Sequence, residues 1–251
     1  MKTKTLVHIL CLIIFMVLNI GATASEIPST TDSSQKLPKV LLFTGGHGFD
    51  KASFYGMIFS LQEMEIDTIS QPLANQSLLS DTIDRYDVIV FYDMWQDISF
   101  DEKEAFLELT KKGTGLVFLH HSLVSYQTWP VFTQIRGGKY YERGYNYVPE
   151  RFSGYKHDIV LEVKIADTAH PVTRGLTDFS IHDEGYFNVG INEDVTPLLS
   201  TSHPECSPIV AWANEYSNSK IVYILLGHDN NSWSNDNFQK LLRNAISWTG
   251  N

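Results

Sequence analysis

The sequence predicts an α/β protein with a mostly parallel sheet flanked by helices. Short apolar runs at residues 39–46, 87–93 and 116–119 have the composition of strands that are buried on both faces. Segments with apolar residues at helical spacing separate these runs. The second half of the chain instead alternates polar and apolar residues between short turns, which indicates an antiparallel extension of the sheet.

The first 24 residues have the pattern of a secretory signal peptide. Lys2 and Lys4 precede an apolar run at 6–20, which ends near the small-residue motif Ala22-Thr23-Ala24. The run is too short to predict a membrane span. We therefore expect cleavage after Ala24, a periplasmic or secreted protein, and no membrane association after cleavage.

The rest of the chain is expected to be a short leader and one domain. Residues 25–38 are polar and rich in Ser, Thr and Pro, which predicts a disordered leader. Residues 39–251 are enough for a single domain with a sizeable core. Only Cys206 remains after loss of the signal, so an intramolecular disulfide and a cysteine-based zinc site are both excluded.

The charge of the chain excludes one class of partner. The formal net charge is −10, and removal of two lysines with no acidic residue takes it to −12. Nucleic-acid binding depends on neutralising phosphates with Lys and Arg. We therefore expect no nucleic-acid partner.

The first half of the chain has the element order of a flavodoxin-like fold with right-handed crossovers. The helix at 100–112 carries acidic residues early and lysines late, which suits the helix dipole. The expected elements are strand 39–46, helix 53–63, an edge-ward strand 66–69, strand 87–93, helix 100–112, strand 116–119 and a short helix 129–135.

The second half is expected to complete the same sheet and to add antiparallel strands. Its last element is an amphipathic helix with apolar residues at helical spacing. The expected elements are strands 159–165, 179–189, 196–200, 209–213 and 221–226, followed by helix 235–248.

Several polar side chains stand where a predicted strand has just ended. They are His47, Asp93, His120, His121 and His228. Because the carboxyl ends of strands face the ligand crevice in open α/β sheets, we expect these side chains to meet there. Histidine titrates near neutral pH and is the commonest metal ligand, so the cluster is either an acid–base site or a metal site. As a metal site it would use His47, His120 and His228 for a divalent ion, Zn or Mn.

Other motifs restrict the chemistry. The loop Gly45-Gly46-His47-Gly48 lacks the Lys-Ser/Thr of a P-loop and the spacing of a dinucleotide fingerprint, so no nucleotide cofactor is expected. The turn after residues 116–119 holds no cysteine, which excludes a thioester glutaminase. Ser122 lacks the G-x-S-x-G context of a serine hydrolase. The pair Asp183-Glu184 is either an ordinary exposed acidic pair or, if its loop folds over the crevice, a base or metal ligand.

Seven motifs occur along the chain in a fixed order: TGGHGF, YDVIVFYD, GTGLVFLHHSL, RGGKY, HPVTRGL followed by DEGY, PIVAW and LLGH. Together they resemble the ThuA-like family, which is named for trehalose utilisation. The resemblance implies a class I glutamine amidotransferase-like fold without the nucleophilic cysteine. It also implies a role in carbohydrate metabolism, beside enzymes that oxidise or cleave glycosides through 3-keto sugars.

The resemblance places the family's site on His47, His120, Glu184 and His228. His121 departs from the family, which commonly has a small residue there, and is either an extra site residue or a core substitution. Successive side chains of a strand point to opposite faces, so we expect only His120 of the adjacent pair to face the crevice.

The expected function is the processing of a small carbohydrate: a disaccharide, a glycoside or a 3-keto sugar. His120 and His228 would act as general acid and base or as metal ligands, with Glu184 as their acidic partner. A carbonyl at C3 acidifies the neighbouring C–H, so a base near neutral pKa could start elimination of the aglycone, and a divalent metal could polarise the keto oxygen. Residues expected to contact the substrate are His47, Asp93, Tyr186, Trp129 and His121.

Two alternatives belong to other functional classes. A noncatalytic carbohydrate-binding or accessory module would need aromatic faces and hydrogen-bonding groups, but no titratable groups around one reacting atom. A structural interaction domain would have no ordered crevice.

Overall fold

Eleven strands lie in residues 37–251, the part of the chain that the computed structural model describes. They are β1 (Lys39–Gly45), β2 (Glu65–Ser70), β3 (Val88–Asp93), β4 (Gly115–Leu119), β5 (Gly138–Lys139), β6 (Gly154–Ile165), β7 (Phe179–Phe187), β8 (Gly190–Ile191), β9 (Thr196–Thr201), β10 (Ile209–Tyr216) and β11 (Ser219–Ile224).

Six α-helices and four 3₁₀ turns connect the strands of the described part. The helices are α1 (Lys51–Ser60), α2 (Leu73–Ser77), α3 (Phe100–Lys112), α4 (Pro130–Arg136), α5 (Asn230–Trp233) and α6 (Asp236–Thr249). The 3₁₀ turns are η1 (Asp81–Arg85), η2 (His120–Val124), η3 (Pro149–Arg151) and η4 (Pro171–Thr173).

Nine strands form one mixed sheet in the order β2-β1-β3-β4-β11-β10-β9-β6-β7. The first five are parallel neighbours, and β10, β9, β6 and β7 continue as antiparallel pairs. Four of the five parallel strands, β1 to β4, thus come early in the chain, and the later strand β11 completes the parallel part beside β4. The fold class predicted from the sequence is confirmed, including the antiparallel extension.

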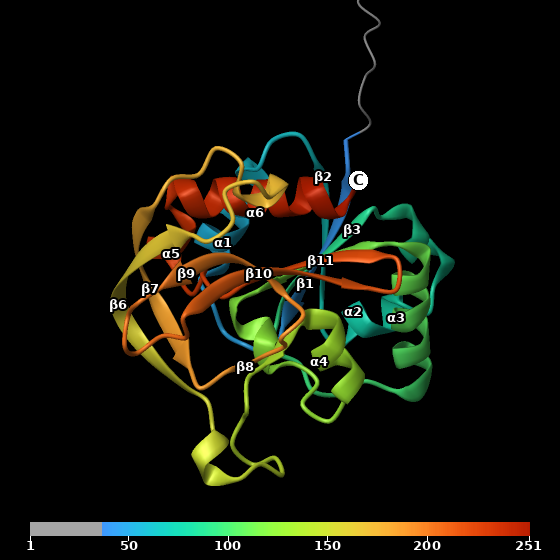
Figure 1. Ribbon diagram of the computed structural model, residues 1–251. Helices are drawn as coiled ribbons and strands as arrows, with labels where there is room; N and C mark the ends of the chain where they lie inside the picture. Colours follow the sequence, from blue (N-terminus) through green and yellow to red (C-terminus); the bar gives the residue numbers. More distant parts are fainter. Residues whose placement is uncertain (1–36) are drawn as a thin grey trace, which may run out of the picture. The chain divides into compact units, whose positions relative to one another are not determined.

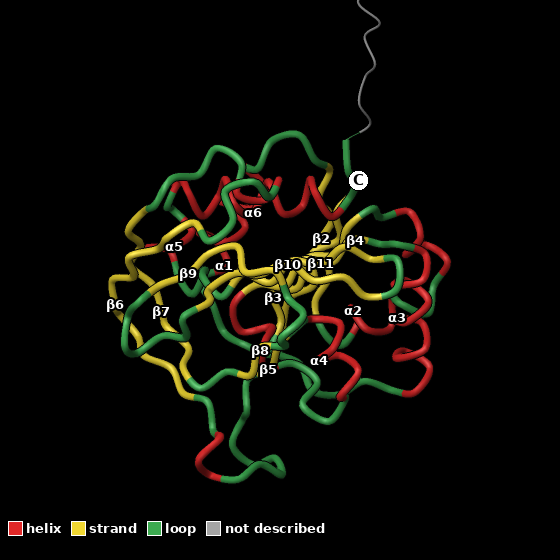
Figure 2. Tube along the Cα trace, in the orientation of Figure 1, coloured by secondary structure: helices red, strands yellow, loops and turns green. Residues whose placement is uncertain are grey.

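Helices cover both faces of the parallel part of the sheet (Figure 1). Helix α6 lies on one face with α1 and α5, whereas α3 and α4 lie on the other. Figure 2 shows the sheet running between these two layers. The strands β3 and β4 are buried along their whole length, as expected for strands covered on both sides.

Helix α3 illustrates why the sequence folds this way locally. Ser99 and Glu102 form a capping box that satisfies free backbone N–H groups at the helix start. Gly113 ends the helix in the left-handed region at φ 85°, which glycine adopts without steric cost. On the inner face of the helix, Phe106 packs against Phe91 of β3, with the ring centroids 5.8 Å apart.

The predictions for residues 1–24 and 25–38 fall, apart from Leu37 and Pro38, outside the described residues. No helix among residues 37–251 is both long and apolar enough to cross a bilayer.

Candidate functional site

The ends of two neighbouring parallel strands bring His120 and His228 together. His120 opens η2 directly after β4, and His228 follows β11, the partner of β4 in the sheet. His120 has φ 43°, a left-handed conformation that is uncommon for a residue with a side chain. Strained backbone of this kind is concentrated at functional sites, where the surrounding fold holds it in place.

Hydrogen bonds fix the tautomer of His120. Its Nδ1 lies 2.6 Å from the carbonyl oxygen of Leu225, and because a carbonyl only accepts, Nδ1 carries the proton. In the neutral ring Nε2 is then an acceptor, which receives the hydroxyl of Tyr186 at 3.0 Å. The two rings also stack, with centroids 4.6 Å apart.

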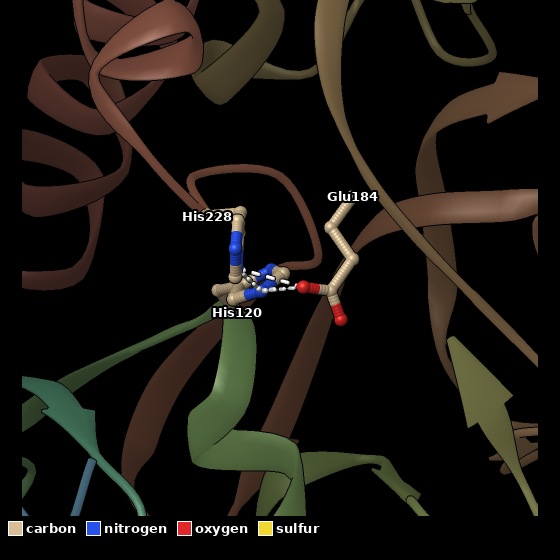
Figure 3. Close-up of side chains that lie close together, drawn as sticks. All are labelled: His120, Glu184 and His228. Carbon is tan, nitrogen blue, oxygen red and sulfur yellow. Dashed lines mark hydrogen bonds and ion pairs between the residues drawn. The ribbon is translucent and has the colours of Figure 1, made fainter. Parts of the chain in front are cut away.

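One carboxylate oxygen of Glu184 lies within 4 Å of a ring nitrogen of each of three histidines. Its Oε2 lies 2.7 Å from His228 Nδ1, 3.0 Å from His157 Nδ1 and 3.9 Å from His120 Nε2. Figure 3 shows Glu184 of β7 pointing toward His120 and His228 from the opposite side of the site. The carboxylate is buried, so this ion pair is screened by water far less than one on the surface.

The ion pair shifts two pKa values in opposite directions. Burial would raise the pKa of Glu184, but the neighbouring rings of His120 and His228, which carry a positive charge when protonated, hold it well below its usual range. Burial would lower the pKa of His228, but the hydrogen bond and the charge of Glu184 outweigh it and raise that pKa. Around neutral pH the carboxylate is therefore ionised and accepts hydrogen bonds from its neighbours.

Asp183 holds the loop that carries His228. It is buried and accepts the backbone N–H groups of Gly227 at 2.8 Å and of His228 and Glu184 at 2.9 Å each. Burial raises its pKa, while the charge of His120 and these three hydrogen bonds oppose the rise. Although DEGY was singled out in the sequence, this positioning role of Asp183 was not predicted.

A cavity of about 320 Å³ opens over this cluster. Its volume falls within the range of roughly 300–1,000 Å³ that is usual for small-molecule sites. Its lining consists of His47, Met94, His121, Val124, Tyr140, Glu142, Tyr155, His157, Glu184, Tyr186 and His228. Glu184 and Tyr186 line this cavity from β7, and Asp183 and Glu184 are both buried, so the acidic pair is neither an exposed pair nor part of a loop.

His47 and His121 form a second pair at the cavity wall. Their rings stack with centroids 4.6 Å apart, and His121 also packs on Tyr92 at 4.3 Å. Neither ring nitrogen of His121 has a hydrogen-bond partner among the described residues, and burial lowers its pKa well below the ordinary value. The expectation that only His120 of the adjacent pair faces the crevice is wrong, because His121 lines the cavity and His120 does not. Strand alternation does not apply to the two residues, since β4 ends at Leu119 and both lie in a 3₁₀ turn.

Two residues expected to contact substrate lie elsewhere. Asp93 is buried among polar side chains, where Gln71 donates to it at 2.8 Å, and burial raises its pKa to about 6. Trp129 packs on Phe132 with the ring centroids 5.4 Å apart. Neither appears among the described residues that line the cavity.

Six lining residues were missed by the sequence argument, namely Met94, Val124 and four residues from one later segment of the chain. Tyr140, Glu142, Tyr155 and His157 come from the segment that joins β5 to β6 and from the start of β6, which project from the body of the domain (Figures 1 and 2). No strand end of the parallel sheet marks them, so the rule that located the other residues could not find them. The only signal was their aromatic and histidine-rich composition.

Three residues of the site, His120, Glu184 and His228, could hold a metal ion. The ligand atoms of His120, Glu184 and His228 all lie within 4.8 Å of one another. Two imidazoles and a carboxylate suit zinc or another divalent transition metal, whose ligand bonds of about 2.0–2.2 Å would place the donor atoms roughly 3.3 Å apart. The bond from His120 Nδ1 to Leu225 leaves Nε2, which here accepts the hydroxyl of Tyr186, as the atom that could bind a metal, an orientation common for metal-bound histidine. Glu184 thus takes the place that the sequence argument gave to His47.

The chain matches the family model described as ThuA, trehalose utilisation, over residues 39–249. A thua-like protein from Parabacteroides merdae ATCC 43184 superposes with a TM-score of 0.71 at 19% identity, over 86% of this chain and 90% of that one. PurLQS from Thermotoga maritima superposes with a TM-score of 0.53 at 11% identity, over 84% and 98% of the two chains, which agrees with an amidotransferase-like fold. Comparison with curated protein sequences finds no match.

The expectation of a periplasmic or secreted protein is wrong. A structurally similar protein from Salmonella typhimurium, 14% identical with a TM-score of 0.54 over 83% of this chain and 98% of that one, is a cytoplasmic protein. The expectation depended on the apolar run at 6–20, which lies outside the described residues. An apolar run of about this length does not by itself distinguish an export signal from a helix of a protein core, because both are apolar.

Proposed function

Because the chain belongs to the ThuA family of trehalose utilisation, we propose that its cavity processes a carbohydrate, and that the substrate is a 3-keto glycoside. The observation that carries the proposal is the pairing of His228 with Glu184. His228 Nδ1 donates to Glu184 Oε2 at 2.7 Å, and no described residue hydrogen-bonds to His228 Nε2. The ring is partly exposed and lines the cavity, so Nε2 is the atom that can exchange a proton with a ligand.

In the proposed mechanism, Glu184 and His228 have the same roles as the carboxylate and the histidine of a hydrolase triad. The carboxylate fixes the ring orientation and stabilises the imidazolium that forms when Nε2 takes a proton. Glu184 also raises the pKa of His228, which makes the histidine a stronger base. A base with a pKa near the working pH is the most effective for proton transfer at that pH.

A 3-keto glycoside offers this base an acidic proton. The ketone at C3 stabilises the carbanion at C2, so His228 Nε2 removes the C2 proton and the electron pair moves into the enolate. The enolate then expels the glycosidic oxygen from C1, forming the C1–C2 double bond. The imidazolium of His228 returns the proton to the departing oxygen, so an unsaturated keto sugar and an alcohol leave without consumption of water.

His120 and Tyr186 support the reacting pair. The hydroxyl of Tyr186 donates to His120 Nε2, and Leu225 fixes the other nitrogen of that ring. His120 in turn lies 3.1 Å from His228 Nδ1 and limits the movement of its ring. Residues that hold a base in place contribute to catalysis by fixing the reacting geometry.

A divalent metal is the second candidate for the centre of the site, on the evidence of the same three ligand atoms. Bound to His120, Glu184 and His228, it would supply Lewis-acid polarisation of the keto oxygen. His228 would then be a ligand through Nδ1 and carry its proton on Nε2, so it could not be the base. The two arrangements use His228 in mutually exclusive ways.

Turnover of 3-keto glycosides tests the proposal. The purified chain, treated with EDTA, is expected to release the alcohol from 3-keto-trehalose or a methyl 3-keto-glucoside, whereas His228→Ala is not. The matched control His170→Asn replaces a histidine that lies outside the cavity lining and keeps a side chain suited to the helix cap that His170 provides. Activity only after addition of Zn²⁺ or Mn²⁺ would favour the metal arrangement. Tight binding of these sugars by wild type without turnover would indicate a noncatalytic binding module.

A further inference from the structure

The strand β6 brings two unassigned side chains to the mouth of the cavity. Tyr155 and His157 are two positions apart, their ring centroids lie 5.0 Å from each other, and both line the cavity. Lys156 between them is paired instead with Glu205, at 3.8 Å. Tyr155 is also the cross-strand partner of Tyr186, whose ring stacks on His120 at the floor of the site. The wall therefore runs from Tyr186 inside to Tyr155 at the rim.

An irregularity in β6 sets the direction of His157. The pairing of β6 with β7 shifts register between Lys156 and Ile159, and Asp158 lies in the left-handed region at φ 57°. Bulges of this kind re-aim a side chain and often occur beside active sites. Here the bulge accompanies the contact of His157 Nδ1 with Glu184 Oε2 at 3.0 Å, which no regular strand pairing accounts for.

The chemistry of this rim suits a polyol. Ionised Glu184 only accepts hydrogen bonds, so Nδ1 of His157 carries the proton and Nε2 of the neutral ring is an acceptor. Glu142 also lines the cavity and adds carboxylate oxygens. In the same cavity lining, the Tyr155 ring lies 5.0 Å from that of His157 and 56% of the residue is exposed. A flat apolar face beside hydrogen-bond acceptors matches a pyranose ring, which presents C–H groups on its face and O–H donors at its edge.

We propose that Tyr155, His157 and Glu142 form an outer subsite for the leaving sugar ring of a disaccharide. The inference rests on the proposed function, because the inner sugar must lie against His228 for the outer ring to reach the rim. It identifies the substrate as a glycoside whose aglycone is itself a sugar. An aryl aglycone would stack on Tyr155 but would leave the acceptors His157 and Glu142 without donors.

Equilibrium binding of unoxidised sugars tests the subsite without turnover. Trehalose has two rings and methyl α-glucoside has one, and neither has the ketone that the proposed elimination requires. In ligand-observed NMR titrations we expect trehalose to bind wild type more tightly than methyl α-glucoside. Tyr155→Ala is expected to weaken trehalose binding about tenfold and that of methyl α-glucoside less than about twofold. Tyr155→Phe keeps the ring and is expected to keep trehalose affinity.

Val160→Ala is the matched control, since Val160 is an exposed residue of the same strand and does not line the cavity. If Tyr155→Ala weakened binding of both sugars equally, or weakened binding of neither, the subsite would be overturned. The proposed function would still stand if wild type turned over 3-keto glycosides. If wild type bound neither sugar and turned over no 3-keto glycoside, the carbohydrate function would fail and the subsite with it.

Discussion

Replacing Glu184 by Gln removes the charge that sets the state of His228 and keeps the shape of the side chain. The carboxylate accepts His228 Nδ1 at 2.7 Å in a buried setting. A hydrogen bond to a charged group contributes about 1.5–3 kcal/mol, against about 0.5–1.5 for a neutral one. The difference of roughly 1–1.5 kcal/mol corresponds to about one pKa unit. The pKa of His228, now raised, should therefore fall by about one unit in Glu184→Gln, because burial still lowers it and only the charges of Asp183 and Asp229 still raise it.

An NMR titration of the histidine ring signals in EDTA-treated protein measures this shift. Glu142→Gln is the control, because it removes a carboxylate from the same cavity that has no contact with His228 among the described residues. His170 provides an internal reference that neither substitution touches. An unchanged His228 pKa in Glu184→Gln, or an equal fall in Glu142→Gln, would refute the ion pair as the cause.

Three further outcomes are expected. Asp183→Asn should lower the free energy of unfolding in urea by about 1–3 kcal/mol, because an amide has one acceptor oxygen for three backbone N–H groups; wild-type stability would contradict this. The folded-state pKa of Glu184 is depressed, so its stabilising contribution is present above the unfolded-state pKa of about 4.3 and is lost as pH falls further. The stability gap between wild type and Glu184→Gln should accordingly narrow below that pH, and a constant gap would argue against the pair. Under the metal arrangement, His120→Ala should retain less Zn²⁺ in equilibrium dialysis than His170→Asn, and equal retention would exclude His120 as a ligand.

The parallel half of the fold was predictable because its signals are local. Residues 116–119 form a fully buried strand, and the helix expected at 100–112 from its charge pattern has the same bounds in the structure. The rule that strand ends converge then placed His120 and His228 together from positions more than a hundred residues apart. Helices α2 and α5 were not predicted, since each is only four or five residues long and carries little periodicity.

The direction of individual side chains was harder to predict than the position of the strands. Asp93 was expected in the crevice because it ends a strand, yet Met94 lines the cavity and Asp93 bonds to Gln71 instead. His157 and Tyr155 reach the site through a bulge in an antiparallel strand, and the bulge depends on the partner strand as much as on the local sequence. The pairing of Glu184 with His228 joins β7 at the sheet edge to the end of β11. The family resemblance implied this pairing, but the rule of converging strand ends could not supply it.

The most direct test of the account is release of the alcohol from a 3-keto glycoside by metal-free wild type and by His228→Ala. The account predicts turnover by wild type, near-complete loss in His228→Ala, and turnover close to wild type in His170→Asn. Unchanged turnover in His228→Ala would show that the base is another group, and the assignment of His228 and Glu184 as the reacting pair would be wrong.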